Sequence, residues 1–386
     1  MLGVCLKYEQ TNYGSKLQAL ATVKLLEELG LDYEIIRYNK RTADFILKSL
    51  PRVFNTVFLH DRYSQIQRKL AFAAHPEVKA KVDHRNGLFS SFDVYFRNNL
   101  SEVYSSYLEL KRQCPARYDK LLTCSDQLWS PSALASGFYN LMFAPEKATK
   151  VSWASSFGVG QIPWYQRGRT RNYLERIQHI SMRENQGAKI VRELTGRDVP
   201  VLMDPVFVFD KAGWDELVPP TEPEWDDYIF CYFLGENPEY RKAAEKLAEE
   251  TGRKIVTLRH LDYYVEEDER FGDYAPYDVD PVRFLNILRN ASCVCTDSFH
   301  GTAFSIIFEK PFIVFNRYSD ASSNSKNSRI ESVCANLNLD GRRFAGKDTI
   351  ICQMEAPIDY AAVSARVGEY GRHTRDYLKA ALCDRN

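Results

Sequence analysis

The sequence predicts an α/β protein with mainly parallel sheets, divided into two halves that face a cleft. Two observations favour this fold class. Apolar strand segments alternate with helical segments through most of the 386 residues, and this alternation is typical of parallel sheets. The proline-rich, acidic segment 216–227 interrupts the alternation, as a linker between domains does. The length is sufficient for two domains that each bury a core.

The first half opens with a strand over 2–6 and a helix over 15–30. Ser15 is a candidate N-cap for this helix, and Gly30 is its expected stop. After a second strand, the pattern resumes only beyond residue 117. The strands predicted in this half are 2–6, 33–38, 118–124, 150–158, 179–184 and 199–209, and the later helices are 165–178 and 186–196.

Residues 41–117 break this rhythm and are rich in Lys, Arg, Phe and Tyr. We expect an insertion of irregular helices that forms a cover or lid. The basic and aromatic content is compatible with a platform for a sugar, but an amphipathic helical cover is the commoner source of such a composition.

The second half repeats the alternation after the linker. Asp280 and Pro281 mark one helix start, as an N-cap and the first helical residue. The predicted strands are 228–235, 254–258, 293–296 and 311–315, and the predicted helices are 238–252, 280–290 and 303–308. We therefore expect an N-terminal domain over 1–210 with the insertion 41–117, a C-terminal domain over 225–350 and a helical segment over 351–386.

The composition argues against several classes of function. The 51 basic residues balance 51 acidic ones, so no global field favours nucleic acid or an anionic membrane, and any anion site must be built locally. Nine cysteines form neither a paired framework nor a CxxC…CxxC zinc pattern, which favours a reduced, cytoplasmic protein without a structural metal. The N-terminus does not resemble a signal peptide, and no run of about 20 apolar residues is present.

The first candidate for a functional residue is His300. The strand 293–296 leads through a polar junction, 297–301, into a helix. The positive end of a helix that follows a strand faces the ligand crevice in such sheets. Gly301 leaves room for an anion, and His300 is suited to donate to a phosphate or carboxylate or to pass a proton. The alternative is a histidine that caps the helix or packs in the core.

Four other segments place polar side chains after strands or next to the predicted cleft. The candidates are Arg183 for binding a phosphate or carboxylate; Ser125, Asp126 and Gln127 for binding hydroxyls, with Trp129 stacking on a sugar ring; Asn12, Tyr13 and Gly14 in the first strand-to-helix loop; and Lys326 and Arg329 in a polar loop. Each group also has a purely structural interpretation. In the same order, these are an ion pair between Arg183 and Glu184, a local turn at Asp126, a tight turn without a ligand, and solvated charges.

Several motifs occur in an order that resembles the polysaccharide pyruvyl transferase family, over about residues 3–342. They are NYGSKLQALA, SDQLW, WASSFG, SMREN, MDPVFVF, YFLG and TDSFHGTAFSIIFEKPFIVF, of which the last is the most specific. Two positions differ from many members. Ser298 and Phe299 stand where some members have Arg-Leu, and Cys124 stands where many have glycine.

The resemblance implies two Rossmann-like domains facing a cleft, as in glycosyltransferases of the GT-B kind. It implies transfer of pyruvate from phosphoenolpyruvate, a co-substrate rather than a bound cofactor, onto a sugar of a bacterial surface polysaccharide or its lipid- or nucleotide-linked precursor. His300 matches the family's catalytic histidine, and Arg183 matches a donor-binding arginine. The expected donor site comprises Ser298, Phe299, Gly301, Thr302, Lys326 and Arg329; the acceptor site comprises Asn12, Tyr13, Gly14, Ser125, Asp126, Gln127 and Trp129.

Two rival functions remain open at this point. A nucleotide-sugar glycosyltransferase would use the same two domains and a histidine at a helix start to hold a diphosphate. A non-catalytic sugar- or anion-binding relative would keep the fold without the chemistry. A lipid-linked acceptor would also require peripheral contact with the inner face of the membrane, for which the basic and aromatic segment 52–72 is a candidate.

Overall fold

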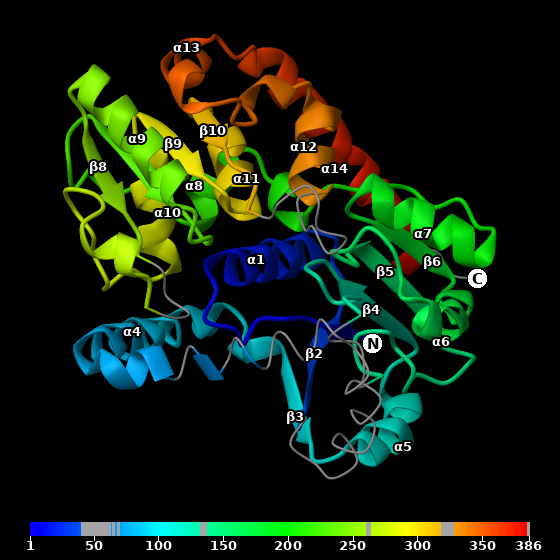
Figure 1. Cartoon of the computed structure of the whole chain (residues 1–386). Coiled ribbons are helices and arrows are strands. Elements are labelled where there is room, and N and C mark those ends of the chain that lie inside the picture. The colour runs from blue at the N-terminus through cyan, green and yellow to red at the C-terminus, as the bar shows by residue number, and fades with distance from the viewer. Residues whose placement is uncertain are drawn as a thin grey trace.

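Six parallel strands form the sheet of the first domain (Figure 1). The computed structural model describes residues 1–39, 63, 66–67, 70–131, 137–259, 264–317 and 328–383. The strand order is β3-β2-β1-β4-β5-β6, which is the Rossmann order with its switch point between β1 and β4. The strands are β1 (Leu2–Cys5), β2 (Tyr33–Tyr38), β3 (Leu100–Tyr104), β4 (Lys120–Cys124), β5 (Thr149–Ser155) and β6 (His179–Met182).

Helix α1 (Tyr13–Glu28) lies between the two domains (Figure 1). Most of its residues are buried on all sides, which explains its many Leu and Ala residues. Its N-cap is Asn12, whose side chain accepts a hydrogen bond from Ser15 N at 3.0 Å, and not Ser15 as the sequence suggested. The remaining helices of this domain are α4 (Pro76–Leu88), α5 (Tyr107–Arg117), α6 (Trp164–Arg176) and α7 (Asn185–Thr195).

Two further predictions for the first domain are wrong. The segment 41–117 is not wholly helical, because it contains strand β3, which pairs with β2 at the edge of the sheet. An edge strand is only partly buried, and Val103 is 52% exposed, so its apolar pattern is weak. The segment 199–209 contributes only Val201 to the sheet, after which Asp204 begins the 3₁₀ helix η4 (Pro205–Val208). Pro205 has no N–H to donate to a strand partner.

Four parallel strands in the order β10-β9-β7-β8 form the second sheet, which confirms the predicted fold class of two mainly parallel sheets with helices. They are β7 (Tyr228–Tyr232), β8 (Lys254–Thr257), β9 (Cys293–Thr296) and β10 (Phe312–Val314). The helices after the first domain are α8 (Lys211–Leu217), α9 (Pro238–Thr251), α10 (Pro281–Asn290), α11 (Phe299–Ile307), α12 (Ser328–Leu337), α13 (Ile350–Glu355) and α14 (Tyr360–Leu382).

The two domains are joined by α14 as well as by α1. Helix α14 returns to the first domain, where Arg375 forms an ion pair with Glu28 at 2.8 Å and Tyr377 donates to the Ser152 carbonyl at 2.8 Å. From α1, Tyr13 stacks on Phe284 of α10 with ring centroids 4.5 Å apart. These contacts fix the spacing of the cleft between the sheets. Within the part of the chain that the structure describes, no helix is long and apolar enough to cross a membrane.

Candidate active site

A cavity of about 220 Å³ lies between the two domains, at the carboxyl ends of β1, β4, β7 and β9. This is the place where ligands bind in sheets of this kind. Both domains contribute to its lining, which consists of Lys7, Gln10, Asn12, Gly14, Ser15, Asp126, Gln127, Tyr232, Leu234, Asp297, Ser298, Phe299, His300, Arg317, Arg329 and Ile330.

The start of α11 holds His300 at this cavity. Ser298 caps the helix by accepting a hydrogen bond from Gly301 N at 3.3 Å, and its own N–H donates to Thr296 Oγ1 at 3.0 Å. A Cβ atom on Gly301 would lie 2.5 Å from that same oxygen, so only glycine fits this close approach. The strand, the cap and the glycine together set the direction in which the imidazole points.

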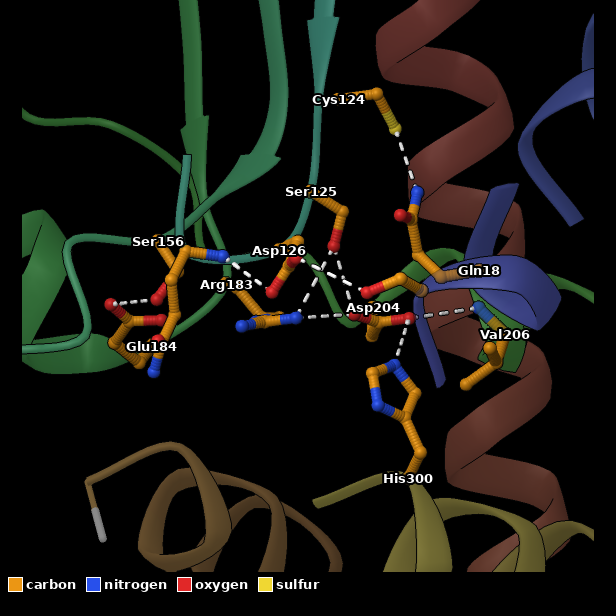
Figure 2. Close-up of polar contacts among 12 residues, drawn as sticks. Gln18, Cys124, Ser125, Asp126, Ser156, Arg183, Glu184, Asp204, Val206 and His300 are labelled. Carbon is orange, nitrogen blue, oxygen red and sulfur yellow. Dashed lines mark hydrogen bonds and ion pairs between the residues drawn. The ribbon is translucent and has the colours of Figure 1, made fainter. Parts of the chain in front are cut away.

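His300 meets a buried ion pair that belongs to the first domain (Figure 2). Its Nε2 lies 3.8 Å from Asp204 Oδ1, while Arg183 Nη1 donates to Asp204 Oδ2 at 2.6 Å. Ser125 Oγ donates to the same carboxylate oxygen at 2.8 Å. Asp204 has no exposed surface, and Arg183 is 2% exposed. We call these four residues the His300 cluster.

The oppositely charged side chains of the His300 cluster stabilise one another. Burial alone would raise the pKa of Asp204, but the His300 and Arg183 side chains hold that pKa below its ordinary value. Burial opposes the charged form of Arg183, and the neighbouring carboxylates, Asp204 first, nevertheless raise its pKa. Asp204 is therefore a carboxylate that is suited to orient the imidazole and to stabilise its protonated form.

A second acidic side chain, Asp126, lies on the wall of the cavity. Its Oδ2 is 3.2 Å from Lys7 Nζ and 3.4 Å from Ser15 Oγ. Burial acts to raise the pKa of Asp126, but Lys7, Arg183 and Arg329 together hold the pKa below the usual range. Ser125 and Asp126 both have positive φ, 42° and 55°, a conformation that is uncommon outside glycine. This strained turn directs one side chain to Asp204 and the other into the cavity.

The imidazole of His300 also packs against the first turn of α1. A Cβ atom built on Gly14 would lie 1.9 Å from Nδ1 and 2.4 Å from Cγ of His300. Glycine at this position therefore admits the histidine. We expect Gly14→Ala to displace the ring and to lower the free energy of unfolding by about 1–3 kcal/mol.

Urea unfolding of Gly14→Ala and Gly168→Ala provides the matched comparison. Gly168 also lies in a helix, has no atom within 4 Å of the added Cβ, and should gain about 0.5–1 kcal/mol from the better helix former. Equal stability of Gly14→Ala and the wild type would show that the close contact with His300 is not maintained in solution.

The structure brings most of the sequence-predicted site residues together. Those that line the cavity are Asn12, Gly14, Asp126, Gln127, Ser298, Phe299, His300 and Arg329. Ser125 and Arg183 lie behind its wall, where they hold Asp204. Gly301 and Thr302 are buried in the first turn of α11 and do not line the cavity. Lys326 lies outside the described residues.

Two aromatic residues do not have the surface that a sugar platform requires. Trp129 has no exposed surface; it packs on Phe157 and Tyr173, and its Nε1 donates to the Tyr139 carbonyl at 3.1 Å. Tyr13 is 1% exposed, with its hydroxyl bound to the Val279 carbonyl at 2.9 Å. The predicted contacts of these two side chains with an acceptor are therefore wrong. Both are core residues, because each packs between elements that are distant in the sequence.

The main residue that the sequence reasoning missed is Asp204. The motif MDPVFVF contains it, but the apolar pattern of this segment predicts a strand. An Asp-Pro pair after an apolar run is a turn signal at the end of a sheet, and it could have identified this position. Lys7, Gln10 and Arg317 also line the cavity without having been predicted. Within the described ranges, no group of three or more His, Cys, Asp or Glu side chains is arranged to hold a metal ion.

Solved structures with low sequence identity share the fold. UDP-GlcNAc 2-epimerase from Neisseria meningitidis bound to UDP-GlcNAc has a TM-score of 0.55 at 11% identity, over 98% of this chain and 99% of that chain. The UDP-GlcNAc 2-epimerase from Methanocaldococcus jannaschii has a TM-score of 0.52 at 11% identity, over 93% and 92% of the two chains. At such identities the similarity shows only the GT-B-type fold.

Comparisons of the sequence itself identify the family. No curated protein matches the sequence at a significant level. The family model described as polysaccharide pyruvyl transferase matches residues 12–319, which include the cap of α1, the strained turn at Ser125, the His300 cluster and most of the residues that line the cavity. With a match over most of its length, this chain belongs to the polysaccharide pyruvyl transferase family.

Proposed function

We propose that the protein transfers the pyruvyl group of phosphoenolpyruvate onto a sugar of a bacterial surface polysaccharide or its precursor, forming a pyruvate ketal and releasing phosphate. The observation that carries the proposal is the His300 cluster, which sets an imidazole against a buried carboxylate at an interdomain cavity in a member of this family. A histidine with a charged partner is a common general acid–base group.

The cavity has the charges that a small, multiply anionic donor requires. Lys7, Arg317 and Arg329 line it together with His300. Helices α1 and α11 both begin at the cavity, so their positive ends converge there. These groups offset the cost of removing the donor's phosphate and carboxylate from water. We assign the donor to the side formed by Ser298, Phe299 and Arg329.

Arg183 has a supporting role in this proposal. Its guanidinium lies over the ring of Phe299 at 4.8 Å and beneath the cavity lining, paired with Asp204. Its Nε and Nη2 atoms are buried without a hydrogen-bond partner among the described residues. Arg183 therefore keeps Asp204 ionised in the free enzyme, and its two remaining donor atoms are available to a donor anion if Phe299 moves.

The acceptor is assigned to the opposite wall. Asn12, Asp126 and Gln127 supply hydrogen-bonding groups there, which suits the hydroxyls of a sugar. The Asp126 carboxylate, held in its charged form, is an acceptor for two neighbouring hydroxyls at once. Both hydroxyls are needed, because a ketal joins two oxygen atoms of the sugar to one carbon of pyruvate.

The reaction balances without a redox cofactor or a metal ion. One sugar hydroxyl attacks the substituted enol carbon of the donor, and a proton adds to the methylene carbon, which becomes a methyl group. The second hydroxyl then forms a bond to the same carbon as the bond to phosphate breaks, and its proton balances the released phosphate. His300 delivers a proton either to the methylene carbon or to the leaving phosphate, with Asp204 stabilising the imidazolium form.

The function is tested by incubating the purified protein with phosphoenolpyruvate and candidate sugar acceptors. We expect phosphate release that depends on the acceptor and a product heavier by one pyruvyl ketal in mass spectrometry. Release of nucleoside diphosphate from a nucleotide sugar, with no reaction of phosphoenolpyruvate, would instead indicate a glycosyltransferase. Binding of phosphoenolpyruvate without phosphate release for any acceptor would indicate a non-catalytic relative.

In this proposal the acceptor determines where in the cell the reaction takes place. A lipid-linked or nucleotide-linked precursor, met in the cytoplasm where phosphoenolpyruvate is made, is the acceptor we favour over the finished polymer. A lipid-linked precursor brings the enzyme to the inner face of the membrane.

A further inference from the structure

The start of α6 carries the most exposed aromatic side chain among the described residues. Trp164 is 84% exposed and Tyr165 is 39% exposed, with their rings in an edge-to-face arrangement at 5.8 Å. By contrast, Trp129, Trp153 and Trp214 have no exposed surface. Leaving two large aromatic rings in water is unfavourable, so their position indicates a surface that another molecule covers.

The same helix carries exposed positive charge directly after the aromatic pair. Arg167, Arg169 and Arg171 all project into solvent, and Arg171 alone has an acidic neighbour on the helix, Glu175 at 2.6 Å. The opposite face of α6 packs on the core through Tyr173 and Leu174. The α6 surface, defined as residues 164–171, thus combines two aromatic rings with a net positive charge in a protein that is neutral overall.

The α6 surface lies on the cavity side of the first domain. Strand β5 ends at Ser155, and the loop that follows leads into α6, so the helix begins at the carboxyl edge of the sheet, where the cavity opens. Gln166 donates to the carbonyl of Pro131 at 3.3 Å, which ties the helix start to the loop that carries Asp126 and Gln127. The α6 surface therefore begins at the same edge of the sheet as the proposed acceptor wall.

We propose that the α6 surface docks the protein on an anionic lipid bilayer. Trp and Tyr prefer the boundary between lipid headgroups and hydrocarbon, and arginines beside them bind lipid phosphates. A sugar platform would explain the rings but not three arginines, which gather positive charge locally on a protein that is neutral overall. The segment 52–72, considered from the sequence for this role, lies mostly outside the described residues.

This inference rests on the proposed function in one respect: the bilayer contact would serve to present a lipid-linked acceptor to the cavity. The bilayer contact itself requires no pyruvyl transfer. Vesicle binding and phosphate release are therefore separate measurements, and failure of one leaves the other interpretable.

Sedimentation with vesicles tests the proposal. Full-length protein should bind vesicles containing phosphatidylglycerol and should bind vesicles of phosphatidylcholine alone much less, with affinity falling as salt is raised. Trp164→Ala and the double variant Arg167→Glu/Arg169→Glu should each lose about tenfold or more in affinity for the anionic vesicles. Their phosphate release with a soluble acceptor should equal that of the wild type.

Two controls match these variants. Tyr274→Ala removes an aromatic side chain that is 42% exposed on the other domain, and Lys147→Glu reverses an exposed charge just before the amino end of β5. Both should bind vesicles as the wild type does. Trp164 fluorescence should also be quenched by lipids brominated on the acyl chain, because Trp164 is the most exposed of the tryptophans.

Three results would overturn the proposal. They are equal binding to neutral and anionic vesicles, losses in the control variants as large as those in the α6 variants, and tight binding of a soluble oligosaccharide that Trp164→Ala abolishes while vesicle binding stays unchanged. The last result would assign the α6 surface to the sugar itself.

Discussion

Replacing His300 with alanine is expected to lower kcat for pyruvyl transfer by about 10²–10⁴-fold, which is the usual contribution of a general acid or base. The side chain is at the cavity. One ring nitrogen points toward Asp204 (Figure 2), and the other lies beside Gly14. Among the residues that the structure describes, no other histidine lines this cavity. Steady-state rates of phosphate release, measured on purified protein, give the change in kcat.

The fold of His300→Ala should stay intact. The buried Asp204 carboxylate keeps its ion pair with Arg183 in this variant. Circular dichroism and thermal unfolding provide that check. The matched control is His373→Ala on α14, where the side chain is 59% exposed, and it should retain the full rate. Added imidazole should restore part of the rate of His300→Ala, because the free base can enter the space that is left. A His300→Ala enzyme with wild-type kcat would remove the residue from the mechanism.

The His300 cluster is assembled from both domains, and this bears on how the enzyme works. His300 belongs to α11 of the second domain, whereas Arg183 and Ser125 follow strands of the first, and Asp204 lies where the chain leaves that domain. The contact between the imidazole and the carboxylate therefore exists only at one spacing of the two sheets. The contacts of α1 and α14 across the domains maintain that spacing.

The sequence was informative where a feature depends on nearby residues. The strand β9, the cap at Ser298 and the helix that carries His300 occupy fifteen consecutive positions, Cys293 to Ile307, and each step has a local signal. The direction of the strand and the place of the helix then follow from the rules of parallel sheets. For this reason the sequence alone predicts that His300 lies at the cleft.

Features that depend on distant residues could not be predicted in this way. Asp204 acquires its role from Ser125, Arg183 and His300, which lie up to 96 positions away, and no local pattern marks a carboxylate as buried. Trp129 looked like a sugar platform because it follows a polar turn, but the helix that covers it is supplied by residues around Tyr173. Whether an aromatic ring is covered depends on tertiary packing, not on its neighbours in sequence.

Replacing Asp204 with asparagine is expected to damage both stability and catalysis. Arg183 would remain buried with its partner uncharged, and breaking a buried pair in this way costs about 3–5 kcal/mol. Asp210→Asn is the control, because Asp210 caps α8 by accepting from Gly213 N at 2.9 Å, and asparagine is an equally good cap. Urea unfolding near neutral pH should separate the two variants clearly.

The free energy of unfolding that Asp204→Asn loses should depend on pH, and the loss should be smaller in acid. The folded-state pKa of Asp204 is lowered, despite the opposing effect of burial, by His300 and Arg183. Its charge therefore stabilises the fold fully above the pKa of an unfolded aspartate, about 3.9, and this contribution is lost as the pH falls through the lower folded value. The difference in the free energy of unfolding between the wild type and Asp204→Asn should become smaller in acid. A difference that becomes larger in acid would contradict a charged Asp204.

The effect of Asp204→Asn on catalysis distinguishes positioning from mere stability. An amide does not attract a positively charged partner as a carboxylate does, so the imidazole of His300 loses the group that orients it. A misplaced imidazole should also lower kcat by about 10²-fold, with a smaller change in the KM for phosphoenolpyruvate. Rates are compared at a temperature where unfolding measurements show the variant to be folded. A variant that is merely less stable would keep the wild-type kcat once folded, and Asp204 would then have no part in orienting His300.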